Sequence, residues 1–544
     1  MRLYHIFLTY FVMTSVVIIR LFYLQIFMQS SFFNISQKNI TNIKSLPTIR
    51  GSIYGSCGNC LAYDDFSFKV EICGVNIEEK IKALEAILNY YPQAKLKRQE
   101  ILANYSTVVA NDIPWSLATI LQNMNIPSLI ISEGYKRMYP YSKMMAHAIG
   151  YVRLNNNMQV GESGTEKSSN THLSGELKRE IRVVNARGFV LDRSSIEKFV
   201  LPKDQKISLN SKIQKYAFNL LSQYRRAALC LIDLTNGGIV SLISIPSYDP
   251  ENLLKNDYWM SVVNHKDSPL LNRVFAGLYP PGSFMKPFVA YTALKTGLIT
   301  PDTSVICTGK FKIGNRFFRC WKQHGKVNLH DAIAQSCDTY FYSLQSKISL
   351  DELQNTLRTC GLFENYNISG FNFSHGKFYS SNIGGERALL LIGQGRVLCS
   401  PIEMLIMFSR MCTNKMITPS FSCDTQLFDS CNLNSKYRSI ILKAMFGVTS
   451  ENGTAYGANF RHRNIVRICG KTSTSQVKEM KENKNHTNIE WHEKDHSIFC
   501  GGVLNNANNF KYAICVVVEH GGSGGGAAAS VACDVLHYAV KNFA

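Results

Sequence analysis

The stretch Tyr279-Pro280-Pro281-Gly282-Ser283-Phe284-Met285-Lys286 decides how this chain is interpreted. Its proline and glycine residues predict a turn, and Ser283 is placed to begin a helix before the apolar run Phe288–Leu294. Residues three apart share one face of a helix, so the Ser283 hydroxyl and the Lys286 amine are expected to touch. A serine beside an unprotonated lysine is an acyl-transfer nucleophile with its own base. Alone the pattern is weak, because chance supplies roughly one or two in a chain of this size.

Two further motifs follow in order along the chain. Ser336-Cys337-Asp338 comes after Leu329–Gln335, which is predicted to be helical, and Lys471-Thr472-Ser473-Thr474 follows Gly470 on a strand predicted to begin at Ile465. S-x-x-K with two such partners marks penicillin-interacting serine enzymes. Each motif taken singly is more often a chance match at the protein surface than a functional site. All three in order, each in a sensible context, favour catalysis.

The chemistry needs these residue types. A second hydroxyl, on Ser336, can relay a proton to a leaving amine. A lysine on an edge strand, Lys471, can hold a substrate carboxylate. The backbone N–H groups of Ser283 and Thr474 are candidates for an oxyanion hole.

Length and composition describe a large globular protein. The 544 residues are 45% hydrophobic and 18% charged, which predicts two to four domains with few long disordered tracts. The formal charge is +20, from 59 basic and 39 acidic residues. These cations are scattered, with no run of five and no aromatic–basic stripe, so nucleic acid is not expected as a partner. The charge suits an anionic surface such as lipid head groups or an acidic polymer.

The N-terminus carries a candidate membrane span. Ile6–Ile19 is uncharged, and Leu21–Met28 continues the apolar run after Arg20. This length is enough to cross a bilayer with the arginine near one end. A cleaved signal peptide is the alternative, but no A-x-A-like site follows. We therefore expect an uncleaved, single-pass anchor.

The order of predicted elements indicates an α+β fold. Residues 30–205 form a mixed, loop-rich region with short strands and a helix at Ile77–Leu88, and the polar segment Leu154–Glu180 is predicted to be a linker or exposed loop. The C-terminal part opens with a strand pair around the Thr235-Asn236-Gly237 turn, continues with helices over most of 284–447, and ends with three more strands and a helix. One sheet is therefore expected to join distant sequence. The expected strands are Ala227–Asp233, Gly238–Ile245, Ile465–Cys469, Ser497–Val503 and Tyr512–Glu519, with a mobile loop at Gln476–His496 and a helix from Gly525.

Among the sixteen cysteines and thirteen histidines of the chain, four residues form one regularly spaced set. Cys307, Cys320, His324 and Cys337 follow C-x12-C-x3-H-x12-C, which suits a closed tetrahedral zinc site. The alternative is one or two disulfides among buried thiols. A second pair of cysteines occurs in Cys57-Gly58-Asn59-Cys60. Four interpretations of this pair stay open: a redox pair, a tight disulfide, half of a metal site, or an incidental or structural role.

With these motifs in place, the chain resembles class B penicillin-binding proteins, the D,D-transpeptidases of peptidoglycan synthesis. Aspartate at position 338, rather than asparagine, and the ending Glu519-His520-Gly521-Gly522 resemble the elongation-type branch, the penicillin-binding protein 2 group, more than division-type members. The other matching stretches are Arg50–Ala62, Tyr139–Val152, Gly161–Lys167, Ile245–Pro250, Gly393–Met404 and Val516–Gly525.

The resemblance implies an organisation and a location. Residues 1–28 would be a short cytoplasmic tail and transmembrane anchor, 29–205 a pedestal of the dimerisation type, and 206–544 the transpeptidase domain, an antiparallel sheet flanked by helices with a helical subdomain. The protein would sit in the inner membrane with its catalytic domain in the periplasm. Its partners would be peptidoglycan precursors and the stem peptides of glycan strands, β-lactam antibiotics and a membrane glycosyltransferase.

The resemblance also assigns roles in the site. Ser283 would attack the penultimate D-Ala carbonyl, with Lys286 as its base, and Ser336 and Asp338 would shuttle a proton and contact the substrate amide. The terminal carboxylate would be held by Lys471, Thr472 and Thr474. Some elongation-type relatives are similar in holding zinc with Asp or Cys at matching places, so a structural zinc is expected at Cys307, Cys320, His324 and Cys337, clamping the loop after Lys310 onto the helix of Ser336.

Two departures from the family pattern stand out. The third motif usually ends in glycine, where this chain has Ser473, and a Cβ there is predicted to narrow the cleft or change β-lactam affinity. The pedestal's usual Asp-Arg-Asn-Gly turn is replaced by the Cys57–Cys60 segment. Three alternatives to elongation transpeptidation therefore stay open: a division-type enzyme, a β-lactam-hydrolysing or β-lactam-sensing relative, and an inactive scaffold that binds a glycosyltransferase.

Overall fold

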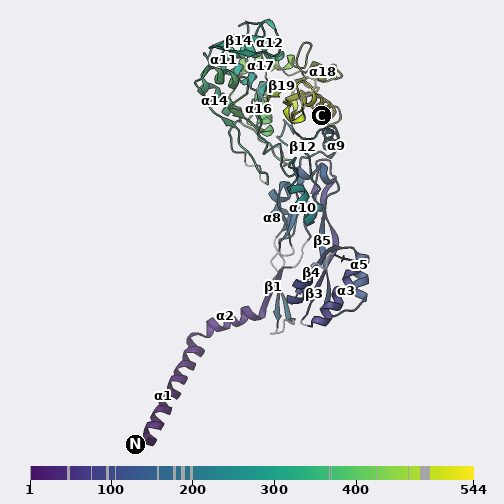
Figure 1. The fold of residues 1–544 in the computed structure, drawn as a ribbon, viewed down its shortest axis with the longest axis vertical. Helices are drawn as coiled ribbons and strands as arrows, with labels where there is room; N and C mark the ends of the chain where they lie inside the picture. Colours follow the sequence, from purple (N-terminus) through teal and green to yellow (C-terminus); the bar gives the residue numbers. More distant parts are fainter. Residues whose placement is uncertain are drawn as a thin grey trace.

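The chain forms an elongated molecule with its membrane-type helix at one end and its largest body at the other (Figure 1). The computed structural model describes residues 2–543 except 46–48, 75, 93–96, 105, 156–157, 176–178, 185–189, 197–199, 367, 369, 425–426, 463–464 and 478–489. Most of the loop predicted at Gln476–His496 therefore lies outside the described residues.

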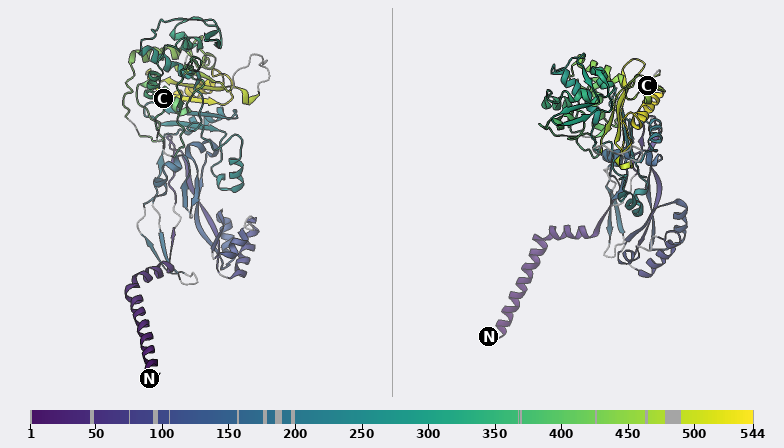
Figure 2. Two further views of the ribbon diagram at one scale, coloured as in Figure 1. Left: turned by 60° about the vertical axis from the view of Figure 1, so that its left-hand side comes forward. Right: turned by 45° about the horizontal axis from the view of Figure 1, so that its top comes forward.

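The N-terminal helix projects away from the rest of the protein (Figure 2). Helix α1 (Arg2–Phe22) runs through the π-helical turn η1 (Tyr23–Phe27) and is followed by α2 (Gln29–Ile40). The 25-residue helical stretch Leu3–Phe27 has an apolar window with a mean hydropathy of 1.9, and none of that window is buried inside the fold. Such a helix is long and apolar enough to cross a membrane, as the sequence predicts.

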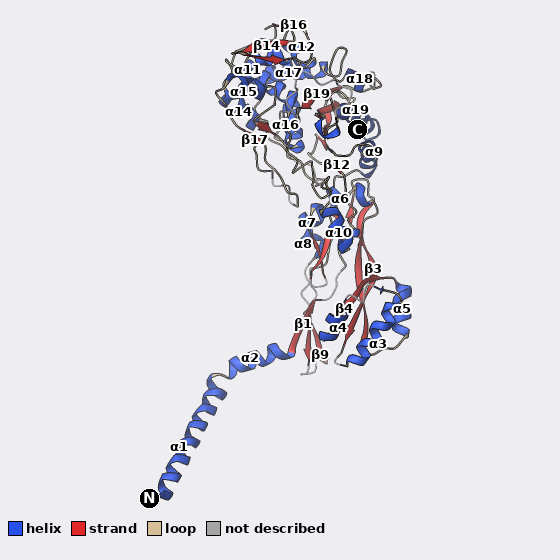
Figure 3. Cartoon of the chain, in the orientation of Figure 1, coloured by secondary structure: helices blue, strands red, loops and turns tan. Residues whose placement is uncertain are grey.

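The middle of the molecule is a pedestal of twisted strands with helices on one side (Figure 3). Its main sheet has the order β10-β2-β3-β4, with β5 also paired to β3, and a second sheet has the order β1-β8-β9. The bounds are β1 Thr41–Ser45, β2 Ile53–Tyr54, β3 Cys60–Cys73, β4 Ser106–Ile113, β5 Leu129–Met138, β8 Arg179–Val184, β9 Val190–Ile196 and β10 Gln205–Lys206, with helices α3 Ile77–Leu88, α4 Arg98–Ala103 and α5 Trp115–Asn123.

The prediction of a linker or exposed loop at Leu154–Glu180 is wrong. This segment contains the end of β6 (Val152–Asn155), β7 (Met158–Gly161), α7 (Gly164–Ser168) and α8 (Asn170–Ser174). Its polar residues misled the prediction because one of them, Glu166, is fully buried in an ion-pair network. A polar sequence can be internal when each charge meets an opposite charge.

That network joins four distant pieces of the pedestal. The Glu166 carboxylate accepts from Arg50 Nε at 2.6 Å and from Arg137 Nε at 2.7 Å, and Arg137 also pairs with Asp64 at 3.1 Å. All four side chains are at most 1% exposed. Burial raises the pKa of Asp64, while the Arg137 charge opposes that rise. Two guanidinium groups and two carboxylates cancel, so the cluster is buried without net charge.

The C-terminal body is built on a five-stranded antiparallel sheet. Its order is β12-β11-β21-β20-β19, so the strand pair at its start is adjacent to strands from the end of the chain. The prediction of an α+β fold whose sheet joins distant sequence is confirmed. The bounds are β11 Ala227–Asp233, β12 Ile239–Ile245, β19 Ile468–Ser475, β20 His496–Leu504 and β21 Phe510–Val518.

Helices cover both faces of this sheet. Helices α9 (Ser211–Leu221) and α19 (Ala527–Phe543) share a core with one face, and α16 (Pro401–Thr413) packs its methionine and phenylalanine side chains against the other. Beyond α16 lies a helical subdomain that includes α11 Lys286–Lys295, α12 Leu329–Ala334, α13 Asp338–Tyr342, α14 Leu350–Thr359, α15 Gly384–Leu391 and α17 Ser435–Gly447. The catalytic motifs lie where this subdomain meets β19.

We predict that Glu166→Ala destabilises the pedestal by about 3–5 kcal/mol, because it leaves two buried guanidinium groups without their shared carboxylate. Urea unfolding measures the effect. Glu85→Ala, at an exposed position of α3, is the control and should change stability little. Equal stability of the two variants would show that the network is not what holds the pedestal together.

Candidate active site

The predicted nucleophile lies on a tight turn at the start of the central helix. Residues Gly282–Met285 form the 3-10 turn η5, and α11 follows directly from Lys286. The helix predicted from Ser283 therefore exists, with a tighter first turn than expected. In a 3-10 turn, side chains three apart eclipse, which places Ser283 and Lys286 on one face. Gly282 has φ +55°, a backbone conformation that favours glycine.

The Lys286 amine is fully buried and reaches across to the second motif. Its Nζ donates to Asp338 Oδ1 at 2.7 Å, to Ser336 Oγ at 3.0 Å and to the Ser336 carbonyl at 2.9 Å. The first and second motifs are therefore joined at one nitrogen. Ser283 is one turn away from this lysine on the same face, and a lysine placed between two serines is suited to passing protons between them.

The second motif is a strained connection between two short helices. Ser336 has φ +57°, which a non-glycine residue adopts only when its surroundings enforce it. Helix α12 ends just before it, and Cys337 caps α13, of which Asp338 is the first residue. The left-handed residue turns both the Ser336 carbonyl and its hydroxyl toward Lys286. This strain is a mark of a functional site that the sequence alone did not reveal.

The third motif lies on the edge strand of the sheet. Strand β19 begins at Ile468, three residues later than predicted, and it continues through all of Lys471–Thr474. Among the described residues, its outer edge pairs with no other strand, so a substrate backbone can add there as a further strand. The Thr472 and Thr454 hydroxyls lie 2.5 Å apart, and Thr474 Oγ1 accepts from Gly524 N at 3.1 Å.

Two buried lysines and one carboxylate leave this cleft with a surplus of positive charge. Burial lowers the pKa of Lys471 well below its usual value, and the nearby Lys286 lowers it further, whereas Asp338 opposes both. Burial raises the pKa of Asp338, against the effect of Lys286. An incoming carboxylate would complete the charge balance.

The loop at Gly393 and Gln394 contacts both the Ser283 turn and strand β19. Gly393 O accepts from Gly282 N at 2.8 Å, and a Cβ on Gly393 would lie 2.1 Å from Gly282 O. The next residue, Gln394, donates from Nε2 to Thr474 O at 2.8 Å. The sequence indicates this loop only through the family resemblance of Gly393–Met404. The groups that the loop contacts become visible only in the fold.

Ser473 is directed into the protein. Its side chain is buried, and its hydroxyl donates to the Pro281 carbonyl at 2.5 Å. We predicted that a Cβ at position 473 narrows the cleft or changes β-lactam affinity. The Ser473 side chain instead points toward the Pro281 carbonyl. The hydroxyl instead fastens the edge strand to the turn that carries Ser283, two residues further on.

A partly buried carboxylate holds the beginning of the same turn. Glu519 Oε1 accepts from the Tyr279 hydroxyl and from Arg273 Nε, each at 2.9 Å. The Tyr279 backbone exchanges both hydrogen bonds with Cys399. Burial and the Glu519 charge raise the pKa of Tyr279, so its hydroxyl stays a donor. The segment that begins at Glu519 and the turn that begins at Tyr279 are therefore joined directly by a side-chain hydrogen bond.

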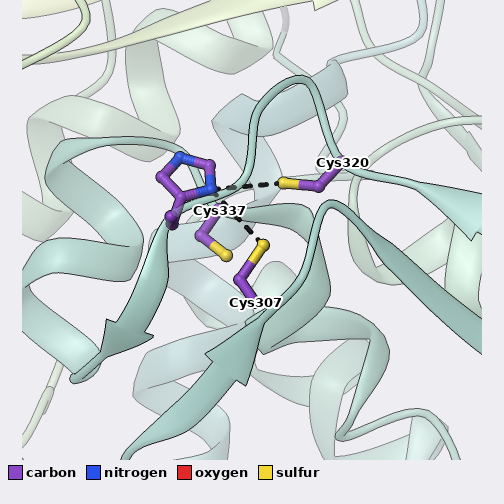
Figure 4. A group of neighbouring side chains, drawn as sticks. Cys307, Cys320 and Cys337 are labelled. Atoms are coloured by element: carbon purple, nitrogen blue, oxygen red, sulfur yellow. Dashed lines mark hydrogen bonds between the residues drawn. The ribbon is translucent and has the colours of Figure 1, made fainter.

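The four residues predicted to bind zinc converge on one point (Figure 4). Their ligand atoms all lie within 4.8 Å of one another, and His324 Nδ1 is 3.5 Å from both Cys307 Sγ and Cys320 Sγ. One ion about 2.0–2.3 Å from each atom fits this spacing. All of these cysteines are free thiols, as are Cys57, in the turn between β2 and β3, and Cys60, the first residue of β3.

The surroundings of this Cys/His cluster also fit a metal. His324 Nε2 lies 3.2 Å from the Gln335 carbonyl, which places a proton on that nitrogen and leaves the lone pair of Nδ1 facing the thiols. Cys320 Sγ accepts from Asp338 N at 3.3 Å. The cluster therefore touches the catalytic motif directly through the backbone of Asp338.

Comparison with protein families identifies the chain. The profile of the "Penicillin binding protein transpeptidase domain" matches residues 227–537, and that of the "Penicillin-binding Protein dimerisation domain" matches residues 45–203. The chain belongs to the penicillin-binding protein transpeptidase family.

Individual relatives narrow this assignment. The chain is 28% identical to "Peptidoglycan D,D-transpeptidase MrdA" of Acinetobacter baumannii, over 95% of this chain and 84% of that protein. It is 26% identical to the protein of the same description from Escherichia coli, over 95% of this chain and 90% of the relative. The structure titled "Complex between Penicillin-Binding Protein (PBP2) and MreC from Helicobacter pylori" matches with a TM-score of 0.78 and 26% identity, covering 92% of this chain and 98% of the other.

We predict that Ser473→Ala slows acylation by a β-lactam about three- to tenfold while changing its initial affinity less, because a lost hydrogen bond of about 1 kcal/mol loosens the Ser283 turn. Stopped-flow measurement with a fluorescent penicillin separates the two constants. Ser473→Thr, which keeps a hydroxyl, is the matched control. Faster acylation by Ser473→Gly would support a narrowed cleft and contradict the fastening role.

We also predict an alkaline loss of affinity for carboxylate-bearing penicillins. Lys471 is charged below its lowered pKa and neutral above it, so its attraction for the carboxylate disappears as the pH rises, and does so below the usual lysine value of 10.5. The dissociation constant of the initial complex, measured against pH, should therefore increase before pH 10.5. An affinity that stays constant up to that pH would show that the Lys471 charge does not hold the carboxylate.

Proposed function

We propose that this protein cross-links peptidoglycan stem peptides by D,D-transpeptidation through a Ser283 acyl-enzyme, in cell-wall elongation and rod-shape maintenance. The observation that carries the proposal is the meeting of the first two motifs at Lys286 Nζ, which belongs to the residue one 3-10 turn from Ser283 and lies within hydrogen-bonding distance of Ser336 and Asp338. Lys471 of the third motif, whose pKa burial lowers, is near enough for the Lys286 charge to lower that pKa further. The names of the matched relatives support the same reaction class.

In the first step Ser283 takes the acyl group of the donor peptide. Its Oγ forms an ester with the penultimate D-Ala carbonyl, and the bond to the terminal D-Ala nitrogen breaks. Lys286 accepts the Ser283 proton, and Ser336, which is 3.0 Å from that amine, passes a proton to the leaving nitrogen. Terminal D-Ala departs with a neutral amine, so protons balance across the step.

Binding of the donor uses the edge strand and the surplus charge. The terminal carboxylate pairs with Lys471 and accepts from the Thr472 and Thr474 hydroxyls. The backbone N–H groups of Ser283 and Thr474 receive the oxyanion, and Gln394 and Ser473 keep these two backbone segments in register. Rigid donors aimed at the developing charge contribute most when they need not reorganise.

In the second step an amine from a neighbouring strand attacks the ester carbonyl. The new amide forms, the ester bond to Ser283 breaks, and the amine proton returns through Lys286 to the Ser283 oxygen. A β-lactam enters the same way, but its ring-opened nitrogen stays attached to the acyl group, so Ser283 remains blocked. This accounts for covalent binding of β-lactams at the proposed site.

The elongation assignment, the location and the partners complete the proposal. The match to proteins described as MrdA and PBP2, together with Asp338 in the second motif, supports elongation over division. The N-terminal helix suits a single-pass anchor in the inner membrane, with the catalytic body in the periplasm. The Helicobacter pylori relative forms a complex with MreC. We extend to this chain an assembly with the elongation machinery, including a membrane glycosyltransferase.

The Cys/His cluster is proposed to hold one structural zinc ion. Cys307, Cys320, His324 and Cys337 supply four ligand atoms, and when bound the ion would neutralise the thiolates and clamp their segments together. No proton passes through it in the proposed reaction. Its role is to fix the hairpin after Lys310 against the second catalytic motif, because Cys337 adjoins both Ser336 and Asp338.

Labelling with a fluorescent penicillin tests the transpeptidase proposal. Wild-type protein should form a long-lived adduct, Ser283→Ala should form none, and Lys286→Ala should acylate at least about 100-fold more slowly because the base is lost. Ser247→Ala, at a serine outside the site, is the control and should label normally. Rapid turnover of penicillin would favour a β-lactamase, and no labelling that depends on Ser283 would favour the inactive scaffold.

Metal analysis tests the zinc proposal. We expect about one zinc per chain in the wild-type protein, its loss in Cys320→Ser, and a lower unfolding temperature with slower acylation in the same variant. Cys57→Ser removes an exposed thiol outside the cluster and should keep the metal. A metal-free preparation with full thermal stability and full acylation would refute the proposal.

A further inference from the structure

The hairpin beside the candidate active site has two chemically different faces. Strands β14 (Lys310–Ile313) and β15 (Arg316–Arg319) pair so that Lys310 is opposite Arg319 and Lys312 is opposite Phe317. Paired residues point to the same side of a two-stranded sheet. The inner side, which carries Phe311 and Phe318, packs on the main core. The outer face consists of Lys310, Lys312, Phe317 and Arg319.

This outer face belongs to a segment with cations and no anions. Residues 303–330 contain no aspartate or glutamate, although the six cations Lys310, Lys312, Arg316, Arg319, Lys322 and Lys326 all fall within them and are all exposed. Within the described part of the chain, none of the five outside Arg319 forms an ion pair with a carboxylate. The hairpin therefore presents positive charge that the protein itself does not neutralise.

Two aromatic rings stand among these cations. Phe317 and Trp321 are each 59% exposed. The Nζ atoms of Lys310 and Lys312 lie 5.2 and 6.0 Å from the Phe317 ring centre, and that of Lys322 lies 4.9 Å from the Trp321 ring. A flat exposed ring with flanking cations suits a partner that has both apolar faces and negative groups.

The position of this aromatic–basic face indicates which anion it meets. The hairpin lies at the end of the molecule opposite α1, in all of the views (Figures 1, 2 and 3). The membrane that holds α1 is therefore out of its reach. The face is close to the catalytic cleft, because Cys320 follows Arg319 directly and accepts a hydrogen bond from the Asp338 backbone. A partner bound here is bound beside the second motif.

We propose that the outer face of the β14–β15 hairpin, together with Trp321 and Lys322 just after it, binds a peptidoglycan strand. Sugar rings stack on Phe317 and Trp321, and stem-peptide carboxylates pair with Lys310, Lys312 and Lys322. This rests on the proposed function, which supplies the substrate class. It adds a docking surface outside the cleft that holds a second strand near the acyl-enzyme. Acylation by a small β-lactam does not need this surface, whereas cross-linking of polymeric strands does.

The expected binding is weak at each contact and strong in sum. Single exposed ion pairs contribute little and are screened by salt, but a polymer engages several cations at once. Binding to intact peptidoglycan should therefore be salt-sensitive. It should depend on the identity of the cations and not only on the +20 net charge of the chain.

The test compares two triple variants of the full-length protein in nanodiscs of zwitterionic lipid. Lys310→Gln/Lys312→Gln/Lys322→Gln removes three charges from the face, and Lys212→Gln/Lys215→Gln/Lys436→Gln removes three exposed charges elsewhere. Co-sedimentation with purified sacculi should weaken about fivefold or more in the first and less than about twofold in the second. Phe317→Ser should also weaken binding. Equal loss in both triple variants, or unchanged binding by Phe317→Ser, overturns the proposal.

Two further measurements distinguish failure of the docking surface from failure of the proposed function. Labelling of Ser283 by a fluorescent penicillin should stay at the wild-type rate in both triple variants, so loss of labelling in the wild-type protein would defeat the proposed function and not the docking surface. Liposomes of phosphatidylglycerol replace sacculi in the second measurement. If the first triple variant loses liposome binding as strongly as sacculus binding, the face recognises anionic surfaces in general and the peptidoglycan assignment is wrong.

Discussion

The contact between the buried Lys286 amine and the Ser336-Cys337-Asp338 turn is the constraint on which the rest of the site depends. A lysine nitrogen with no exposure needs polar partners, and here a carboxylate oxygen at 2.7 Å and two oxygens of Ser336 provide them. Lys471 adds a second buried cation nearby, so one carboxylate faces two amines. Two amines in one site suit a carboxylate of the kind that a D-Ala-D-Ala terminus would bring.

Much of the surrounding structure maintains that geometry. The turn that carries Ser283 is fastened from three sides: by Glu519 through Tyr279, by the Gly393 backbone, and by the Ser473 hydroxyl. The second motif is held by its strained Ser336 backbone and by the Cys/His cluster behind it. These supports come from five separate segments of the chain, which is why a large domain is needed to place three short motifs.

Sequence patterns predict this architecture where local chemistry is decisive. The strand Ala227–Asp233 and the helix Ile77–Leu88 have the predicted bounds, since apolar runs and caps specify them. Polar segments are predicted less well. Glu166 lies in a stretch interpreted as a linker because its buried partners, Arg50 and Arg137, are remote in sequence.

The same limit applies to the site and to the hairpin. The motif residues Ser283, Lys286 and Ser336 were predictable from spacing, but the direction of the Ser473 side chain was not, because it depends on how β19 faces the Pro281 turn. The absence of an aromatic–basic stripe in the sequence is likewise misleading, since cross-strand pairing brings Lys312 and Phe317 together on one face. Side-chain direction is a property of the fold, and a linear pattern does not contain it.

The central claim is that Ser283 carries the donor acyl group. Its most direct test is mass spectrometry of the protein after a short incubation with a pentapeptide ending in D-Ala-D-Ala, without an acceptor amine. The account predicts an adduct on the peptide containing Ser283, with the mass of the pentapeptide acyl group after loss of one D-Ala. An adduct on another residue, or one that retains both D-Ala residues, would contradict it.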